Sequence, residues 1–379
     1  MSISRRSWFS ILILLVAACA HDDSGTSAGR RFPEELAAAL QASLDRSVAD
    51  GLAPGVSLHV WHPDHGSWAG ASGTGDIGRG TPLSPAAHFR AGSMIKPLVA
   101  TAILQRVERG ELALDAKLTD LLPTAITDSI DDAATIELRM LLDHTSGIPE
   151  FLDPNIEAAA GADPAHVWTL AEFLASVEAQ AAGTPGAGYG YLNTNYVLLG
   201  EILSAQTGRD WRDVVTEDVI DRAGMTESSL PLPGDRAVPA PVARGYIALG
   251  DQGLVDFSGM DPSMAAASGG HALITTTADM TTFLRALLAG ELFDDPGTLA
   301  QMLAYRPAVE AEAFQTGYGL GIALTEVEGR RFVGHLGRTA GYWGFHLHAP
   351  ATGYTFSGYM NVEGDLGAFV APILDLLGG

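Results

Sequence analysis

FRAGSMIK, residues 89–96, is the stretch that decides how the rest of this sequence is interpreted. A long apolar run follows it, with Pro97 at a position typical of a first helical turn and Gly110 as the expected end of the helix. Ser93 and Lys96 are three residues apart, so on a helix they point the same way, one turn apart. That geometry brings an amine within reach of a hydroxyl, which lets a serine act as a nucleophile without a histidine.

The bulk composition is that of an ordinary folded protein with ample core. The 379 residues are 47% hydrophobic and 18% charged, and the length suits two domains or one domain with an insertion. Lys and Arg total 22 against 45 Asp and Glu, which gives a net charge of −23. Nucleic acid is not expected as a partner, because phosphate binding needs clustered Lys and Arg.

The N-terminus is predicted to be a targeting segment. Arg5 and Arg6 form a positive region, and residues 8–16 are apolar but too short to span a bilayer as a mature helix. Residues 16–19, Val-Ala-Ala-Cys, resemble the lipobox of bacterial lipoproteins, in which the cysteine becomes the lipidated first residue. We therefore expect an exported protein that meets the membrane through a lipid anchor only.

Cys19 is the predicted lipidation site of a periplasmic or cell-envelope lipoprotein. Residues 1–18 would then be the signal peptide and residues 19–32 a small, polar tether. The alternative is a signal peptide cut after Ala18 or Ala20, with an incidental cysteine. Because Cys19 is the single cysteine, the sequence allows no disulfide within the mature protein and excludes a catalytic cysteine.

Strand patterns at both ends of the chain flank a helical middle, which predicts an α+β fold. The economical architecture is an antiparallel sheet built from both chain ends, flanked by helices, with an inserted all-helical subdomain. We expect one domain over residues 33–379, with an α/β part at about 33–92 and 265–379 and a helical part at about 93–264. The expected terminal helices are 33–50 and 366–377, and the expected strands are 56–61, 66–73, 318–327, 330–334, 344–349 and 354–360.

No cofactor and no metal site are predicted. His59, His62 and His65 recur every three residues, but an extended segment cannot place all three on one face. Residues 73–78 fit the pattern G-x-G-x-x-G, yet the residues that follow do not open the helix that a dinucleotide fold requires. We therefore expect residues 73–78 to form a hairpin loop.

Two further motifs raise the serine–lysine pair above chance. Tyr191-Leu192-Asn193 follows a loop rich in Gly and Pro and precedes an apolar helix, and His335-Leu336-Gly337 is placed at the end of an apolar strand. Singly, Ser93 would be a helix N-cap, Lys96 a solvated side chain and His335 a surface histidine. In this order, the motifs S-x-x-K, Y-x-N and H-x-G indicate one catalytic site.

The three motifs together resemble the serine penicillin-recognising hydrolases, a group that includes D-Ala-D-Ala carboxypeptidases, class C β-lactamases and related esterases. Residues 89–93 (FRAGS) and 141–148 (LLDHTSGI) match further phrases of that group. The resemblance extends from about residue 34 to the C-terminus and implies the β-lactamase/transpeptidase-like fold. It also implies that Ser93 attacks an acyl carbon and becomes an acyl-enzyme, that Lys96 takes the serine proton, and that Tyr191 relays a proton to the leaving group.

The same resemblance implies the binding residues. Asn193 is expected to hydrogen-bond both Lys96 and a substrate amide, and His335 to contribute to the proton network. The oxyanion hole would be the backbone N–H groups of Ser93 and Arg338, and Gly337 would let substrate lie against the strand edge. For His144, within the LLDHTSGI segment, we expect a structural role, in which it braces its loop by hydrogen bonding.

The third motif favours one reaction within the group. A histidine there is more similar to the D-Ala-D-Ala carboxypeptidases and some esterases than to class C β-lactamases, which use lysine. Leu336 departs from the carboxypeptidases, which usually carry Thr there to help bind the substrate carboxylate, although Arg338 or Thr339 could compensate.

The leading hypothesis is therefore an exported D-Ala-D-Ala carboxypeptidase-like peptidase. The alternatives are a carboxylesterase or β-lactamase-related hydrolase and, from another class, an inactive peptidoglycan-binding lipoprotein. The partners expected are a small peptide, ester or β-lactam substrate and peptidoglycan. Loss of the serine, lysine or tyrosine would favour the inactive class, and all three are present.

Overall fold

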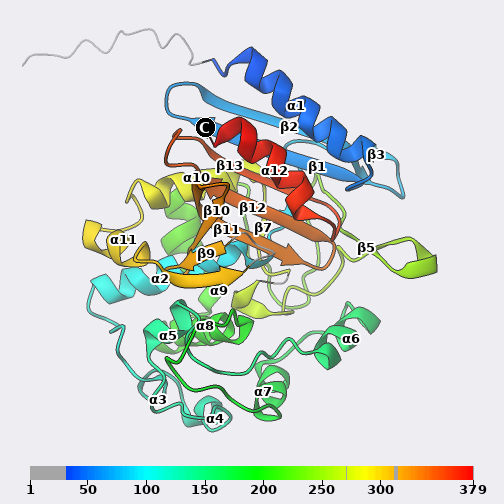
Figure 1. Ribbon diagram of the computed structural model, residues 1–379. Helices are drawn as coiled ribbons and strands as arrows, with labels where there is room; N and C mark the ends of the chain where they lie inside the picture. Colours follow the sequence, from blue (N-terminus) through cyan, green and yellow to red (C-terminus); the bar gives the residue numbers. More distant parts are fainter. Residues whose placement is uncertain (1–30, 270, 311–314, 379) are drawn as a thin grey trace, which may run out of the picture. The chain divides into compact units, whose positions relative to one another are not determined.

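A nine-stranded antiparallel sheet is the framework of the computed structural model, which describes residues 31–269, 271–310 and 315–378. The strands run in the order β3-β2-β1-β13-β12-β11-β10-β9-β8 (Figure 1). Their bounds are β1 (Gly55–His62), β2 (Gly66–Asp76), β3 (Thr81–Pro82), β8 (Arg306–Glu310), β9 (Gln315–Tyr318), β10 (Ala323–Val327), β11 (Arg330–Thr339), β12 (Tyr342–His348) and β13 (Thr355–Met360). Because β1 pairs with β13, the sheet is built from both chain ends, as the sequence predicts.

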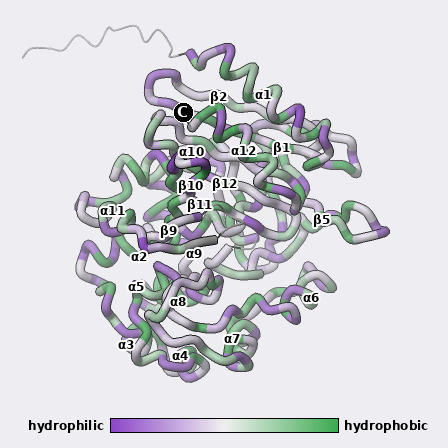
Figure 2. Tube along the Cα trace, in the orientation of Figure 1, coloured by the Kyte–Doolittle hydropathy of each residue, from purple (hydrophilic) through white to green (hydrophobic). Residues whose placement is uncertain are grey.

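Alternation along β1 explains how helices cover both faces of the sheet. Val56, Leu58 and Val60 are buried in a cluster with α1 (Glu34–Ala49) and α12 (Leu366–Leu377). The intervening side chains face α10 (Thr277–Leu288), where Arg285 lies 3.5 Å from the Trp61 ring centroid. Hydrophilic and hydrophobic residues alternate along α1, as expected of a helix with one buried face (Figure 2). Both terminal helices therefore lie where the sequence predicts them.

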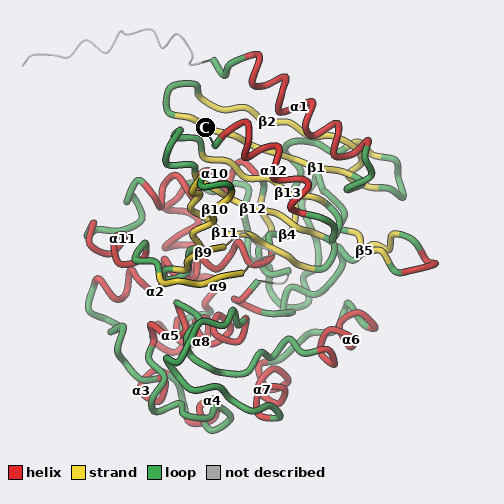
Figure 3. The backbone as a smooth tube through the Cα atoms, viewed as in Figure 1, coloured by secondary structure: helices red, strands yellow, loops and turns green. Residues whose placement is uncertain are grey.

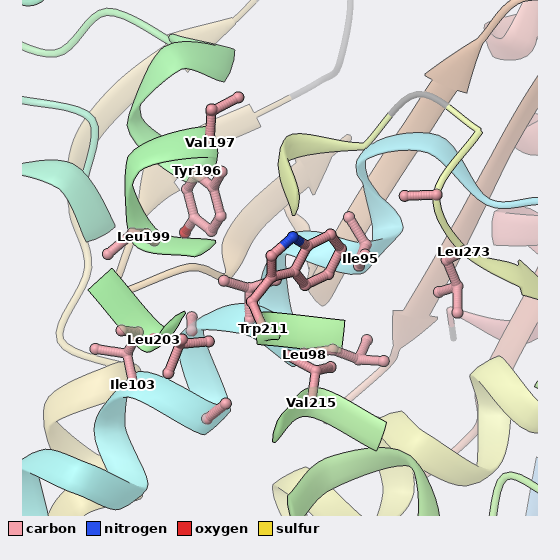
Figure 4. Packing of buried hydrophobic residues seen from close by; sticks show 14 of the residues in the cluster. Ile95, Leu98, Ile103, Tyr196, Val197, Leu199, Leu203, Trp211, Val215 and Leu273 are labelled. Atoms are coloured by element: carbon pink, nitrogen blue, oxygen red, sulfur yellow. The ribbon is translucent and has the colours of Figure 1, made fainter. Parts of the chain in front are cut away.

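The helix that follows Ser93 is buried on nearly all sides. α2 (Lys96–Glu108) begins after a 3-10 turn, η1 (Gly92–Ile95), so Ser93 precedes the α-helix rather than opening it. The helix packs against α8 (Asn193–Thr207) and α9 (Trp211–Val215), and Figure 4 shows the apolar residues that meet there. The sequence-based expectation of a central buried helix is confirmed.

The remaining elements of the described residues are short. The helices of the middle of the chain gather on one side of the sheet, away from α1 and α12 (Figures 1 and 3). These helices are α3 (Leu118–Leu121), α4 (Thr124–Thr127), α5 (Leu138–Leu142), α6 (Pro154–Ala162) and α7 (Leu170–Glu178). The other elements are β4 (Phe89–Arg90), the π-helical turn η2 (Thr216–Asp221), β5 (Tyr246–Ala248), η3 (Gly250–Gln252), β6 (Leu254–Asp256), η4 (Ala266–Ser268), β7 (Ile274–Thr275) and α11 (Pro296–Met302).

Two strand predictions near the third motif are wrong in their bounds. The segment 318–327, predicted as one strand, is divided between β9 and β10 by a turn that contains Gly319 and Gly321. The strand predicted to end at residue 334 continues to Thr339, because the two-residue turn that leads to β12 comes only after it. The His335-Leu336-Gly337 motif therefore lies inside a strand and not at its end.

The hairpin segment 73–78 and the three histidines of residues 59–65 are placed as the sequence predicts. Residues 73–78 form the end of β2 and the turn into β3. His62 and His65 stack with ring centroids 4.4 Å apart, whereas His59 faces Arg285 on the other side of the sheet. Within the described ranges, no three His, Cys, Asp or Glu residues gather closely enough to hold a metal ion, and no helix is long and apolar enough to cross a membrane. Cys19, the predicted signal peptide and most of the predicted tether lie outside the described residues.

Candidate active site

The first two motifs meet around the Lys96 ammonium. Lys96 Nζ lies 2.9 Å from Ser93 Oγ and 2.8 Å from Asn193 Oδ1. The Tyr191 hydroxyl is hydrogen-bonded to Ser93, and the Lys96 nitrogen lies 4.8 Å from the Tyr191 ring centroid. The structure thus brings together the three residues predicted to be catalytic and the asparagine predicted to support them.

Two glycines allow β11 to approach the nucleophile closely. A Cβ on Gly337 would lie 2.2 Å from the Ala91 carbonyl oxygen, and a Cβ on Gly92, whose φ is +56°, would lie 2.6 Å from the Arg338 carbonyl oxygen. Both distances are far inside van der Waals contact, so a side chain at either position would push β11 away from Ser93. Gly337, predicted to make room for substrate, therefore makes room for the chain just before Ser93.

One edge of β11 is free beside Ser93. β10 pairs with β11 only as far as Gly334, so residues 335–339 pair with β12 alone. Thr339 pairs with Tyr342 across the two-residue turn between β11 and β12. In the next pair, Arg338 and Trp343 exchange no backbone hydrogen bonds, because such pairs alternate with hydrogen-bonded pairs along an antiparallel ladder. The Arg338 N–H therefore points to the free edge. This geometry suits the predicted oxyanion hole of the Ser93 and Arg338 N–H groups.

Burial makes Lys96 a base that works near neutral pH. Its side chain has no exposed surface, and this desolvation lowers the pKa of the amine to about 7, against a smaller opposite effect of Glu150. Asn193 Oδ1 and the Ser268 carbonyl oxygen accept two of the hydrogens on Nζ. The third position on Nζ is therefore directed at Ser93 Oγ, and in the uncharged amine that position is a lone pair.

Tyr191 is held as a neutral phenol by its surroundings. Burial raises its pKa well above the ordinary value, so its hydroxyl is a proton donor at neutral pH. The His144 ring lies 4.5 Å from the Tyr191 ring, and His144 Nδ1 accepts a hydrogen bond of 3.2 Å from the Leu192 N–H. The His144 carbonyl oxygen accepts another, of 2.9 Å, from the Gly190 N–H. His144 thus holds the chain on both sides of Tyr191 by hydrogen bonds.

His335 forms a wall of the site and is uncharged. Burial, followed by the Lys96 charge, lowers its pKa to about 3. Its Nδ1 lies 2.5 Å from the Leu336 carbonyl oxygen, which can only accept, so we assign the proton to Nδ1. Nε2 then accepts from the Tyr318 hydroxyl at 2.9 Å. The His335 and Tyr191 ring centroids lie 6.1 Å apart.

A pocket of about 820 Å³ opens at Ser93, and many of the residues that line it are apolar. Its lining includes Arg338 and two residues that the guanidinium contacts, Trp343 and Glu363. Leu336 also lines the pocket and has no hydroxyl to offer a substrate. The apolar wall consists of Leu152, Pro154, Ile247, Phe257, Met260 and Met264.

Both side chains predicted to compensate for Leu336 already have polar partners. Arg338 Nη2 and Nε lie 2.7 and 2.9 Å from one carboxylate oxygen of Glu363, and the guanidinium lies 5.6 Å from the Trp343 ring centroid. The Thr339 hydroxyl is turned toward His271 Nδ1, at 3.1 Å. The pocket therefore presents no unpaired cation to a substrate carboxylate among the described residues, apart from the buried Lys96.

Three contributors to the site were not found from the sequence. Ser268 acts through its backbone carbonyl, which carries no signal of residue type, and Tyr318 lies in the segment predicted as an uninterrupted strand. The third is Glu150, whose Oε2 accepts a hydrogen bond of 2.5 Å from the Asn193 N–H. A signal for Glu150 was available, because it stands two residues after the LLDHTSGI segment at the edge of the same turn.

This fold and this site define a class of serine hydrolases. The Beta-lactamase family model matches residues 40–377, so the chain belongs to that family and is a serine hydrolase of the β-lactamase and penicillin-binding protein type. Penicillin-binding protein 4 of Amycolatopsis lactamdurans is 28% identical over 332 residues, which cover 83% of this chain and 82% of that protein.

Two other similar proteins carry names that refer to D-stereospecific hydrolysis or to a D-aminopeptidase. The D-stereospecific amidohydrolase from Streptomyces sp. superimposes with a TM-score of 0.78 and 29% identity, over 88% of this chain and 97% of that one. The D-aminopeptidase of Cereibacter sphaeroides is 25% identical over 285 residues, 74% of this chain. The matched part is 51% of that D-aminopeptidase, so this chain spans about half its length.

Proposed function

We propose that this protein hydrolyses amides or esters that carry no carboxylate beside the scissile bond, through an acyl-enzyme on Ser93. The observation that carries the proposal is the pairing of Arg338 with Glu363, which occupies the cation that a terminal carboxylate would need. Two further features disfavour carboxylate binding: Leu336 has no hydroxyl, and the Thr339 hydroxyl is turned toward His271. The proposal thus favours the amidase or esterase alternative over a carboxypeptidase.

The reaction follows from the proton positions in the site. Uncharged Lys96 takes the Ser93 proton as Oγ attacks the acyl carbon, and the N–H groups of Ser93 and Arg338 stabilise the oxyanion, each by about 3 kcal/mol. Tyr191, a neutral phenol beside Ser93, donates a proton to the leaving amine or alcohol and is reprotonated from the Lys96 ammonium. Water then attacks the acyl-enzyme by the reverse sequence of transfers.

The apolar wall of the pocket indicates the chemical character of the substrate. Burial of an aromatic or branched acyl group against Phe257, Met260 and Met264 would contribute about 1.5–3 kcal/mol. The amidohydrolase and aminopeptidase names of the similar proteins make amides of apolar D-amino acids the first substrates to test.

The D-Ala-D-Ala carboxypeptidase reaction is the second candidate, favoured by the similarity to a penicillin-binding protein over most of both chains. A matched pair of substrates separates the two: an N-acyl-D-Phe amide, and the same acyl group on D-Phe-D-Ala with a free carboxylate. We expect higher kcat/KM for the amide, with both activities absent from Ser93→Ala. Higher kcat/KM for the peptide would overturn the proposal in favour of the carboxypeptidase.

The same assay addresses the inactive peptidoglycan-binding alternative. Turnover of either substrate that disappears in Lys96→Ala excludes a protein that only binds. Turnover that survives in Lys96→Ala would show that the proton route described here is wrong.

We also propose export and lipid anchoring at Cys19. Support comes from the sequence pattern of residues 1–19, which lie outside the described residues. Cells that express the full chain and are fed a labelled fatty acid should label the wild type and not Cys19→Ser. Equal labelling of both, or of neither, would contradict the lipid anchor.

A further inference from the structure

Glu150 is a carboxylate that the mechanism above does not use, although it contacts the site directly. Its Oε1 accepts the Leu152 N–H at 2.9 Å, and its Oε2 accepts the Asn193 N–H at 2.5 Å. The side-chain amide of Asn193 donates a further hydrogen bond to it. Burial raises the pKa of Glu150, but these three donors and the Lys96 charge act the other way. Burial is the largest of these effects, so the pKa of Glu150 lies above its ordinary value, while the three N–H donors favour the anion.

The contact fixes which way the Asn193 amide faces. An asparagine amide has a donor end and an acceptor end, which can exchange places by a half-turn of the side chain. A carboxylate can only accept, so Glu150 binds the NH₂ end and leaves Oδ1 toward Lys96, at 2.8 Å. Without Glu150, the amide could turn its NH₂ group toward the lysine and lose that hydrogen bond.

Glu150 also supplies negative charge to surroundings that are otherwise uncharged. The other groups facing Lys96 come from η1, the His144 turn, the Tyr191 loop, α8, η4 and β11. They are the Ser93 hydroxyl, His144, Tyr191, Asn193, Tyr196, the Ser268 carbonyl and His335. The pKa values of both histidines are lowered by burial, and those of both tyrosines are raised by burial, so all four are neutral near pH 7. Glu150 favours the charged form of Lys96.

We propose that Glu150 is a positioning residue that orients Asn193 and sets the pH range in which Lys96 accepts the Ser93 proton. The proposal rests on the Ser93–Lys96 chemistry proposed above, but not on the identity of the substrate. It explains why the turn that follows the LLDHTSGI segment lies against the N-terminus of α8. In this chain, one carboxylate links that turn, the helix start and the catalytic base.

The rate at which a fluorophosphonate labels Ser93, measured against pH, tests the proposal. In that reaction Oγ bonds to phosphorus, fluoride leaves and the serine proton passes to Lys96, so the rate follows the uncharged amine. In Glu150→Gln the lost charge should move the rising part of the profile about one unit to lower pH. The labelling rate at high pH, where Lys96 is fully uncharged, should also fall, because a turned Asn193 amide no longer accepts a hydrogen bond from Lys96.

Glu201→Gln is the matched control. Glu201 is another partly buried carboxylate on α8, whose pKa burial raises, but it lies away from the site beside Arg212. The profile of this control should match that of the wild type. An equal shift in both variants would show a general effect of removing charge and would overturn the proposal.

The double variant Glu150→Gln with Asn193→Asp moves the charge next to Lys96. The amide introduced at position 150 can donate to the new carboxylate at position 193, and its single oxygen can keep one of the two backbone N–H bonds. The negative charge then lies closer to the amine. We expect its profile to rise at higher pH than the wild type, opposite to the single variant. A purely structural role for Glu150 predicts a rise in the double variant but no shift to lower pH in the single variant, so the two opposite shifts together support the proposal.

The outcomes separate the two proposals. If wild-type Ser93 is not labelled, the proposed nucleophilic chemistry fails. If it is labelled but Glu150→Gln, shown to be folded by circular dichroism, keeps the wild-type pH profile, the role of Glu150 is refuted. If Glu150→Gln does not fold, the double variant decides: a profile at or below the wild-type pH range refutes the proposal.

Discussion

Glu363→Gln should change the preference of the enzyme toward substrates that carry a carboxylate. In the structure both Nη2 and Nε of Arg338 donate to one oxygen of Glu363, so the guanidinium is neutralised at the pocket lining. The neutral glutamine keeps the size of the side chain and removes the competing charge. Arg338 then becomes available to a carboxylate at the end of the substrate.

The size of the effect follows from the exposure of Arg338. A hydrogen bond to a charged group contributes about 1.5–3 kcal/mol, but the Arg338 side chain is 64% exposed, and water screening reduces the gain to about 1 kcal/mol. That free energy corresponds to about a 5-fold rise in kcat/KM for the substrate with a free carboxylate. For the matching amide, kcat/KM should stay within about 2-fold.

The assay compares kcat/KM for the two substrates in the wild type and in the variant. Glu328→Gln is the control, since Glu328 pairs with Arg330 on an exposed turn far along β11 from Ser93. A ratio of kcat/KM values that is unchanged by Glu363→Gln would refute the argument that this pair blocks carboxylate binding. The same holds if the gain survives when Arg338→Ala is added to Glu363→Gln.

Three other measurements test the site and the fold. First, kcat/KM should rise with pH through about 7 as Lys96 loses its proton, because its pKa is about 7, and a pH-independent rate between 6 and 8 would contradict Lys96 as the base. Second, Gly337→Ala should cost about 1–3 kcal/mol of stability and at least 10-fold in kcat/KM, because its Cβ would overlap the Ala91 carbonyl. Gly188→Ala, with nothing within 4 Å, should change neither the urea midpoint nor the rate. Third, His346 is buried without hydrogen-bond partners, and burial lowers its pKa well below 6.5. The unfolded chain therefore binds the extra proton, so stability is full above pH 6.5 and falls by about 1.4 kcal/mol per pH unit below it. Urea unfolding of His346→Leu at pH 7.5 and 5.5 should show a smaller loss than the wild type, and an equal loss would contradict this assignment.

The residues that act through their side chains were those the sequence could reveal. The motif spacing predicts a nucleophile, a base and a proton donor in one site, and the structure brings these three residues together: Ser93, Lys96 and Tyr191. The sheet from both chain ends was also predictable, because alternating apolar residues mark the strands at each end. Helix and strand identity thus followed from local patterns.

What the sequence did not reveal depends on contacts between distant positions. The pairing of Arg338 with Glu363, 25 residues further on, leaves no local pattern, yet it decides how the pocket treats a carboxylate. The Ser268 carbonyl is a backbone atom, and any residue supplies one. The length of β11 was underestimated because its glycines suggest a break, whereas Gly334 lies against His346 of β12 and Gly337 against the chain before Ser93.

The pairing of β1 with β13 has a consequence for how the enzyme comes into being. The Gly55 N–H binds Asn361 Oδ1 across 306 positions of sequence, and β13 lies between β1 and β12 in the middle of the sheet. None of the catalytic groups lies on β13, yet a chain that ends before it would lack the strand that joins the two halves of the sheet. A growing chain therefore carries Ser93, Lys96 and Tyr191 long before it can use them. The site can form only after β13 has entered the sheet, so we expect no hydrolysis by a chain that stops before this strand.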